Sequence, residues 1–525
     1  MKKINCTKNV LEAWYGNHLV LILESLIVGL LTGIVITAFR KSIDIVSLLR
    51  ETIYGSINYK NIFTVLIPIT AVIILGLLMG FLIKKYPMIK GSGVSQIKGN
   101  FMKKLVLSVW PELPLKFIGG VLSISTGLSV GREGPSVQIG AYVGSAFEKL
   151  GKRSHIEKVC LITGGAAAGL AATFGAPFAG VVFAMEDLHQ YLSPLLLTCV
   201  MIGSAAGDFV SSVFFKQGAI FDFEGIKLFP LKYSGYLILL GILTAIIGDI
   251  FKKAIYTSQK IYGKLNIPQT LRPLIPFLLS VPVCIFLPLS ASGGDNLIEA
   301  VVEENFQIKF ILILLVVKII FTGISAGSGA IGGIFVPLLS CGALTGILFS
   351  KFLTGVNLIE QEYAVNLMIF SMAAFFTTVI KAPLTAIVLL TETSGRFFHL
   401  GGILLTVLSA YITANLIRSP ANDEVLLKQL LADKTEKESR RKTACEEGKQ
   451  MFEVFVSHES QLDGKLISQV KWPANCLIVS LVHGEDEFIP DGNTKISAGD
   501  RLIVLTDSEK IHEYVTLLGE MGGLN

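Results

Sequence analysis

Apolar stretches long enough to cross a membrane recur throughout this chain. The segment from Ile62 to Ile83 has no charged residue and can span a hydrocarbon layer of about 30 Å. Only 16% of all residues are charged, whereas a soluble protein has about 25%. The sequence therefore predicts an α-helical polytopic membrane protein, with similar apolar stretches at 19–39, 192–215, 233–248, 273–290, 309–323 and 400–417.

The charges and cysteines exclude several classes of protein. The net charge of +5 is small for 525 residues and does not suggest nucleic-acid binding. Seven cysteines are scattered without a CxxC pair, so we expect no disulfide framework, no metal site and no cofactor. The first apolar run continues past any cleavage site, so we expect no signal peptide. Basic pairs flank the apolar runs, in keeping with the positive-inside rule, at 84–85, 103–104, 152–153 and 252–253.

An internal repeat runs through the apolar part of the chain. It predicts two related halves, roughly 20–220 and 232–422, divided near 220–232. Such repeats often have inverted topology, and their broken helices then meet near the middle of the membrane. Packing of small residues between helices would also explain matched glycines. Pairs at a spacing of 202 are Pro135/Pro337, Gly140/Gly342, Gly144/Gly346 and Phe147/Phe349, and pairs at 206 are Ala176/Ala382, Pro177/Pro383 and Glu186/Glu392.

The segment Gly131-Arg132-Glu133-Gly134-Pro135 places a carboxylate between glycines in an apolar region. Gly134 and Pro135 are typical of a helix start, because the N–H that proline lacks would be unpaired there anyway. A helix N-terminus carries partial positive charge and unpaired N–H groups, which suit an anion. The Glu133 carboxylate could occupy such a site until a proton or an arriving anion displaces it. We therefore interpret Glu133 as the gate of an anion pathway.

Three segments, in order, resemble the motifs of the CLC family of chloride channels and chloride/proton antiporters. Residues 131–135 are similar to its gating-glutamate signature, residues 91–95 (GSGVS) to its Gly-Ser-Gly-Ile-Pro motif, and residues 333–337 (GIFVP) to its Gly-x-Phe-x-Pro motif. The resemblance covers roughly residues 20–422 and implies a CLC-type inverted repeat of broken transmembrane helices. Val94 and Ser95 depart from the usual Ile-Pro, and Gln96 replaces an acid.

The resemblance implies a chloride site formed by both halves: Ser92, Gly93, Gly134, Ile334 and Phe335. Ser92 matches the serine of the family's central chloride site, where serine favours chloride over nitrate or fluoride. An ordinary helix cap is the lesser alternative for this serine. Ile334 and Phe335 would offer backbone N–H groups to the ion, although a phenylalanine in an apolar helix more often serves only packing.

Three charged positions bear on proton and ion movement. Lys116 lies in an apolar segment, where a lysine is usually functional or paired, and it resembles a family lysine that makes the pore electropositive. Pairing with a carboxylate such as Glu112 is the alternative. Asp187 falls where proton-coupled relatives have an internal proton-transfer glutamate, with Glu186 beside it. Two adjacent acids suit a proton relay, but they could also be a solvated pair at a helix end.

The chain changes character after Pro420. Residues 1–422 form the predicted transmembrane domain, 423–450 a charged linker and 451–525 a small α+β domain. The last segment resembles the TrkA-C (RCK C-terminal) module, where many CLC proteins have CBS domains. We expect strands at 452–456, 476–482 and 501–506, and helices at 464–470 and 510–518. The resemblance implies a cytoplasmic regulatory domain with a small, nucleotide-like ligand.

The sequence favours a homodimeric chloride/proton antiporter of the cell membrane, in contact with lipid and moving chloride and protons. A passive chloride channel of the same fold is the alternative. Asp187 favours the antiporter, whereas Asn422 favours the channel, because it stands where the family has a pore-lining tyrosine. The TrkA-C-like segment alone would suggest a cation-uptake subunit. Such a subunit would need TVGYG-like filter loops, and the sequence has none. An enzyme is not indicated, because HExxH is absent.

Overall fold

The structure is a computed structural model of the chain. It describes residues 2–56, 62–148, 154–190, 193–215, 221, 227–265, 267–423, 425–431, 449–458, 460–473, 475–483, 486–507 and 511–523. The basic pair at 152–153, part of the divide near 220–232 and most of the linker at 423–450 lie outside these residues. The chain separates into two compact units, Met1–Gln429 and Leu430–Asn525.

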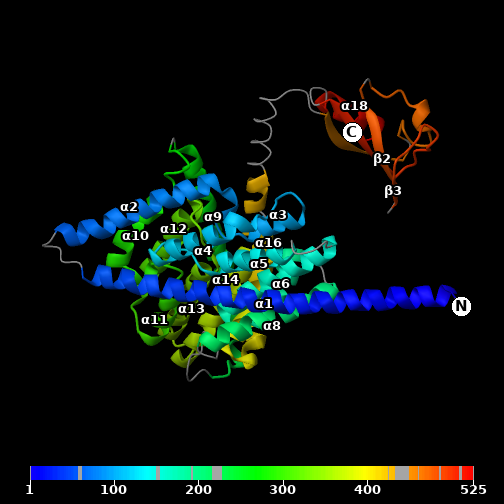
Figure 1. The fold of residues 1–525 in the computed structure, drawn as a ribbon. Coiled ribbons are helices and arrows are strands. Elements are labelled where there is room, and N and C mark those ends of the chain that lie inside the picture. The colour runs from blue at the N-terminus through cyan, green and yellow to red at the C-terminus, as the bar shows by residue number, and fades with distance from the viewer. Residues whose placement is uncertain are drawn as a thin grey trace. The chain divides into compact units, whose positions relative to one another are not determined.

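The first unit contains two sets of helices that follow one another along the chain (Figure 1). The first set is α1 (Lys2–Gly55), α2 (Ile62–Lys85), α3 (Val94–Phe101), α4 (Val109–Ser125), α5 (Glu133–Glu148), α6 (His155–Phe174), α7 (Pro177–Phe183) and α8 (Pro194–Phe214). The second set is α9 (Ser234–Lys264), α10 (Leu274–Phe286), α11 (Asp295–Glu303), α12 (Ile308–Gly327), α13 (Phe335–Gly355), α14 (Ala364–Ile380), α15 (Pro383–Ser394) and α16 (Leu400–Leu416).

These helices combine full membrane spans with short pieces. Within the described residues, eight helices are long and apolar enough to cross a membrane. α3, α7 and α11 have eight, seven and nine residues, too few to cross. Large apolar side chains are exposed along α1, α2, α8, α9 and α12, where lipid rather than water would cover them. The first unit is therefore a multi-pass membrane domain that contains broken helices.

The glycines matched by the repeat allow the same helix contacts in both halves. A Cβ on Gly140 would lie 2.0 Å from the Gly165 carbonyl oxygen on α6. A Cβ on Gly342 would lie 2.8 Å from Cα of Met372 on α14. Both distances are shorter than real Cβ contacts, so only glycine allows α5 to approach α6, and α13 to approach α14, this closely. Packing therefore accounts for part of the repeat.

Two glutamates at the 206 spacing exchange helix caps between the halves. The Glu186 carboxylate accepts N–H bonds from Leu384 and Thr385 at the start of α15, at 3.0 and 2.7 Å. The Glu392 carboxylate accepts N–H bonds from Phe178 and Ala179 at the start of α7, at 3.1 and 2.8 Å. Each half thus caps a helix of the other, as a two-fold relation between the halves requires.

The second unit is a small sheet with one helix. Its strands are β1 (Lys449–Phe455), β2 (Leu477–His483), β3 (Asp486–Phe488) and β4 (Arg501–Asp507), in the order β1-β4-β2-β3 with all neighbours antiparallel. Helix α18 spans Ile511–Met521. Val454, Leu481, Leu502 and Leu518 belong to its buried core. This unit has an apolar core of its own.

The second unit corrects one predicted helix. Residues 464–470 form turns with a single 3-10 turn at Ile467–Gln469, not a helix. The N–H groups of Gly464 and Ile467 donate to the carbonyls of Ile496 and Thr494, at 2.9 and 3.0 Å. These donors are therefore paired with a distant segment instead of a helical turn. The sequence also gave no indication of β3.

Candidate ion-binding site

The three motif loops meet in the middle of the first unit. Gly131 and Gly333 exchange two backbone hydrogen bonds, each N–H donating to the other's carbonyl at 2.7 Å. The Gly332 N–H donates to the Gly91 carbonyl at 3.2 Å. Segments more than 200 residues apart are thereby joined through their main chains. The loops before α3, α5 and α13 consequently form one structure.

Glycines make this meeting possible. A Cβ on Gly134 would lie 2.8 Å from Cβ of Ser92 and 3.0 Å from Cα of Gly333. Gly93 has φ of +99°, and a Cβ there would lie 2.2 Å from the Gln138 side-chain oxygen. Both the left-handed conformation and the close approach exclude larger residues. Ser92, Gly134 and Gly333 therefore belong to a single site.

Three helices begin at this site. Gly93 is the N-cap of α3, α5 starts at Glu133, and Ile334 is the N-cap of α13. The first N–H groups of a helix have no partner within it, and the helix dipole adds partial positive charge. Ile334 and Phe335 are buried, so few waters can reach these donors. The arrangement provides what an anion needs without a fixed positive charge in contact with the ion.

The Glu133 side chain lies at the junction of the two halves. It is fully buried, and neither carboxylate oxygen has a hydrogen bond of normal geometry. The nearest donors are the N–H groups of Glu133 itself and of Val336, and the Arg132 Nε atom lies 4.0 Å from Oε1. A carboxylate that is buried without strong partners is costly. Protonation of the carboxylate, or movement of the side chain out of this position, would remove that free-energy cost.

Two buried lysines hold the loops that precede α3 and α11. The Lys116 ammonium donates to the carbonyls of Ile89 and Gly91, at 3.0 and 2.7 Å. The Lys318 ammonium, 202 residues further on, donates to the carbonyls of Ser290 and Ser292, at 3.2 and 2.8 Å. Lys116 is thus not paired with Glu112, whose carboxylate accepts a hydrogen bond from the Tyr142 hydroxyl at 2.9 Å. Gly91 joins Lys116 directly to the site.

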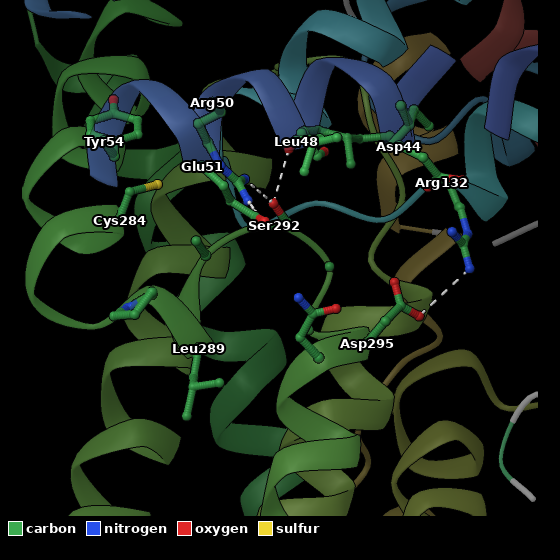
Figure 2. A pocket seen from close by; sticks show the side chains of 18 of the residues that line it. Asp44, Leu48, Arg50, Glu51, Tyr54, Arg132, Cys284, Leu289, Ser292 and Asp295 are labelled. Carbon is green, nitrogen blue, oxygen red and sulfur yellow. Dashed lines mark hydrogen bonds and ion pairs between the residues drawn. The ribbon is translucent and has the colours of Figure 1, made fainter. Parts of the chain in front are cut away.

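A cavity of about 850 Å³ reaches the loop before Glu133. Gly131, Arg132 and Asp295 line it, together with residues 43–55 of α1 (Figure 2). The Arg132 Nη2 atom lies 3.8 Å from the Asp295 carboxylate, and Figure 2 shows the two side chains pointing toward each other. We call this cavity the Arg132 pocket. It gives solvent a route to the residue beside Glu133.

Asp187 lies in a π-helical turn, η2 (Ala184–His189), which is not one of the motif loops. Its carboxylate forms an ion pair with the Lys98 ammonium of α3 at 2.8 Å, and both side chains are buried. Glu186, beside it, serves as the cap of α15. The two adjacent acids therefore have different partners and do not form a solvated pair.

The segment after Pro420 also approaches α3. The Lys252 ammonium donates to the Pro420 carbonyl at 2.8 Å, and the Ser95 hydroxyl donates to the Asp423 carbonyl at 3.2 Å. Asn422 is 2% exposed, and its side-chain oxygen has no hydrogen-bond partner. Ser95, which departs from the family motif, therefore ties the start of α3 to this segment.

Comparison with known proteins identifies the family. The sequence model of the voltage-gated chloride channel family matches residues 75–415. This chain belongs to that family, the CLC family. A TrkA-C domain model matches residues 451–519. The predicted polytopic helical fold and the resemblance to both modules are confirmed.

Three solved structures share the CLC fold. The crystal structure of a slow cyanobacterial Cl⁻/H⁺ antiporter has a TM-score of 0.74 and 26% identity, over 78% of this chain and 98% of that chain. A CLC-type fluoride/proton antiporter has a TM-score of 0.63 and 22% identity, over 76% and 95% of the two chains. A eukaryotic CLC transporter has a TM-score of 0.65 and 21% identity, over 78% and 74%. The last two likenesses show the fold alone.

In this CLC chain the candidate residues fall into three groups. Ser92, Gly93, Gly134, Ile334 and Phe335 come together with Glu133 at the motif loops. Lys116 is joined to them through a loop carbonyl. Asp187 and Glu186 lie apart, on η2.

Sequence reasoning missed three charged residues near these groups. Lys318 repeats Lys116 at the 202 spacing, which was a usable signal. Asp295 follows the Gly293-Gly294 pair and faces Arg132, but nothing in the sequence links the two. Lys98 pairs with Asp187, which lies 89 residues further along the chain, and no repeat in the sequence relates the two positions. Only the three-dimensional fold could reveal these last two contacts.

Proposed function

We propose that this protein is a chloride/proton antiporter in which protonation of Glu133 opens the anion pathway. The observation that carries the proposal is the buried Glu133 carboxylate, held at the meeting point of three helix N-termini without a hydrogen bond of normal geometry. There it competes with an anion for the same donors. Protonation removes its charge, so proton uptake and anion entry become linked events. The 26% identity with a cyanobacterial Cl⁻/H⁺ antiporter supports this assignment.

Chloride would bind where the halves meet. The backbone N–H groups of Ile334 and Phe335 supply donors from one half, and the Ser92 hydroxyl supplies one from the other. Gly93 and Gly134 allow the main chain to approach the ion closely. Weak donors of this kind suit transport, because an ion must leave as readily as it enters. The buried ammonium of Lys116 adds positive charge without touching the ion.

Protons would reach Glu133 by a route separate from the anion path. Asp187 is the second acid on that route, since it is buried and stands on η2, outside the three motif loops. Transfer between carboxylates needs hydrogen-bond reach or a bridging water. Glu186 is less suited to this role, because three donors already engage its carboxylate.

The positive-inside rule supports an orientation in the cell membrane. α1 ends at Gly55 and α2 begins at Ile62, so these two ends share one side of the membrane. α2 ends at Lys84-Lys85, which places that end in the cytoplasm. The Arg132 pocket, lined by residues 43–55, then opens to the outside. The family resemblance supports a homodimer with a cytoplasmic TrkA-C domain that binds a small, nucleotide-like ligand.

Chloride and proton fluxes measured together in liposomes test the proposal. Wild-type protein should move protons uphill when a chloride gradient drives it. Glu133→Gln keeps the shape and loses the charge, so chloride flux should persist without pH dependence while proton movement stops. Glu148→Gln, the same change at the far end of α5, is the matched control and should remain coupled. Proton pumping by Glu133→Gln would refute the gate.

A passive chloride channel is the second candidate, and Asn422 favours it. The family's pore-lining tyrosine would narrow the inner end of the pathway, whereas Asn422 has a short side chain with an unpartnered oxygen. Without an inner constriction, an open outer gate would let chloride flow freely. Wild-type liposomes that release chloride rapidly with no proton movement would establish the channel.

A further inference from the structure

The ion pair between Lys98 and Asp187 conflicts with simple proton transfer through Asp187. The two charged groups are 2.8 Å apart, and the side chains are only 10% and 7% exposed. A nearby ammonium favours the charged form of a carboxylate, and low solvent exposure strengthens that effect. Asp187 must nevertheless become neutral each time it accepts a proton. The ion pair therefore opposes the step that the relay requires.

We propose that Lys98 is a positioning residue for proton transfer, which holds Asp187 charged and in place so that each proton entering from the inner side must separate this ion pair. The inference rests on the proposed antiport function and deepens it. It makes the separation of Lys98 from Asp187 a control point for proton entry, distinct from the gate at Glu133.

Among the described residues near η2, Lys98 forms an ion pair with Asp187. In the part of the chain that the structure describes, α3, α6 and α7 pack most closely against η2, and the start of α15 is bound to Glu186 of η2. Lys98 is the charged residue of α3, and α7 has none. On α6, Glu157 accepts a hydrogen bond from the Ser154 N–H at the helix cap, and Lys158 pairs with Glu148 at 2.9 Å. His155 of the same helix is exposed, and Cys160 is buried. On η2 itself, Glu186 caps α15 and His189 shares a hydrogen bond with Thr163 at 2.7 Å.

A second contact, between two aromatic rings, holds α3 against η2. The Phe101 ring of α3 stacks on the His189 ring of η2, with centroids 4.5 Å apart and planes inclined by 26°. This contact does not depend on the charge of Lys98. Loss of the ammonium should therefore leave α3 and η2 packed, so that an uncharged variant reports on proton transfer and not on folding.

α3 also links the ion pair to the anion site. Gly93 caps its first turn beside Ser92, and Lys98 lies in its second turn. The ion pair and the anion site therefore lie on the same eight-residue helix, which stays packed on η2 through the Phe101–His189 contact when the pair separates.

Proton uptake as a function of inner pH tests the inference, with the pH of the two membrane faces set separately. In Lys98→Gln the carboxylate no longer faces an ammonium and accepts a proton at higher pH. Proton-coupled flux falls as the inner pH rises, and the midpoint of this fall should therefore move to more alkaline inner pH by about one to three pH units. Lys98→Arg keeps the charge and should stay near wild type. Lys103→Gln removes an exposed charge five residues away and should also leave the midpoint unchanged.

Two backgrounds separate a proton role from a structural one. In Glu133→Gln, chloride flux needs no proton, so adding Lys98→Gln should change that flux by less than about twofold. In Asp187→Asn, which has no carboxylate to hold, Lys98→Gln should have no further effect on proton movement. A large loss of chloride flux in the Glu133→Gln background would overturn the inference by showing that Lys98 supports the fold.

The failures of the inference and of the proposed function are distinguishable. If wild-type protein moves no protons, the antiporter proposal fails and the inference with it. If wild-type protein pumps protons but Lys98→Gln keeps the wild-type midpoint, only the inference fails. Lys98→Met is the second uncharged variant and should behave as Lys98→Gln does. If neither uncharged variant folds, Lys98 is structural and the inference is refuted.

Discussion

The two buried lysines show how single residues fix the geometry of the site. Lys116 and Lys318 each hold two carbonyls of a loop that ends in a left-handed glycine, Gly93 with φ of +99° and Gly294 with φ of +109°. A carbonyl in a membrane interior needs a donor. The ammonium supplies it, and the loop in turn satisfies the ammonium. The lysine that we propose makes the pathway electropositive, Lys116, thus also holds its loop in place.

Removal of these clamps should cost stability in both halves. Lys116→Met or Lys318→Met leaves buried carbonyls without their donor, at about 1–3 kcal/mol of unfolding free energy. Only Lys116→Met should also change chloride affinity, because its loop carries Ser92. Thermal unfolding of the purified protein and chloride flux in liposomes measure the two effects. Lys116→Met with wild-type stability would show that the clamp is unimportant.

Ser92 sets a prediction about ion selectivity. Ser92→Pro removes a hydroxyl and an N–H beside the predicted chloride site, so the preference for nitrate over chloride should rise. Ser92→Ala removes the hydroxyl alone and should give a smaller change in the same direction. Relative nitrate and chloride fluxes in liposomes provide the measurement. An unchanged ratio in both variants would place Ser92 outside the selective site.

The sequence could predict the composition of the site but not all of its charges. Glu133 and the glycine motifs could be recognised because the chemistry depends on local helix starts, which have local signals. The repeat predicted that broken helices of the two halves meet, and Gly131 bonds to Gly333 where they do. Lys98 and Asp295 could not be found, because ion pairs between distant segments depend on how helices pack, and no spacing in the sequence encodes that.

At the scale of elements, reciprocal contacts between the halves shape the membrane unit. Glu186 of the first half caps α15, and Glu392 of the second half caps α7. Both capped helices start with an Ala-Pro pair, where proline removes one unpaired N–H and the glutamate satisfies the next two. The repeat at spacing 206 is therefore explained by a cap that each half gives to the other.

Loss of either cap should have the same effect. Glu186→Ala and Glu392→Ala each leave the first N–H groups of a helix without their charged acceptor, which should lower the free energy of unfolding by about 1–3 kcal/mol. Thermal unfolding should show similar losses for the two variants, and surviving protein should still exchange chloride for protons. If Glu186→Ala alone stops proton movement at normal stability, Glu186 belongs to the proton relay.

Element boundaries were predictable where they depended on local signals. The strands at 452–456, 476–482 and 501–506 overlap β1, β2 and β4, because alternating apolar residues mark them. The helix predicted at 464–470 was wrong, since its backbone bonds to residues 492–496 instead. Long-range pairing of this kind outweighs local propensity, and short strands such as β3 carry too few residues to be recognised.

At the scale of the whole molecule, each unit contains what it needs to fold. The three motifs, both lysine clamps and both glutamate caps lie within Met1–Gln429. The second unit, Leu430–Asn525, has a buried core of its own around Val454 and Leu502. Separate cores favour separate folding of the two units.

Deletion of residues 449–525 should therefore leave a folded, chloride-transporting membrane protein. We expect the truncated protein to keep its assembly state on size-exclusion chromatography and its chloride flux within about twofold of wild type, because independent domains couple weakly. What should disappear is the response to a cytosolic small molecule, with nucleotides and cyclic dinucleotides as the probes added to the liposomes. Leu502→Asp in the full chain is the matched comparison, since a charge in the core of the second unit should unfold that unit alone. Loss of assembly in the deletion, with normal assembly in Leu502→Asp, would show that residues 449–525 hold the membrane unit together and do not merely regulate it.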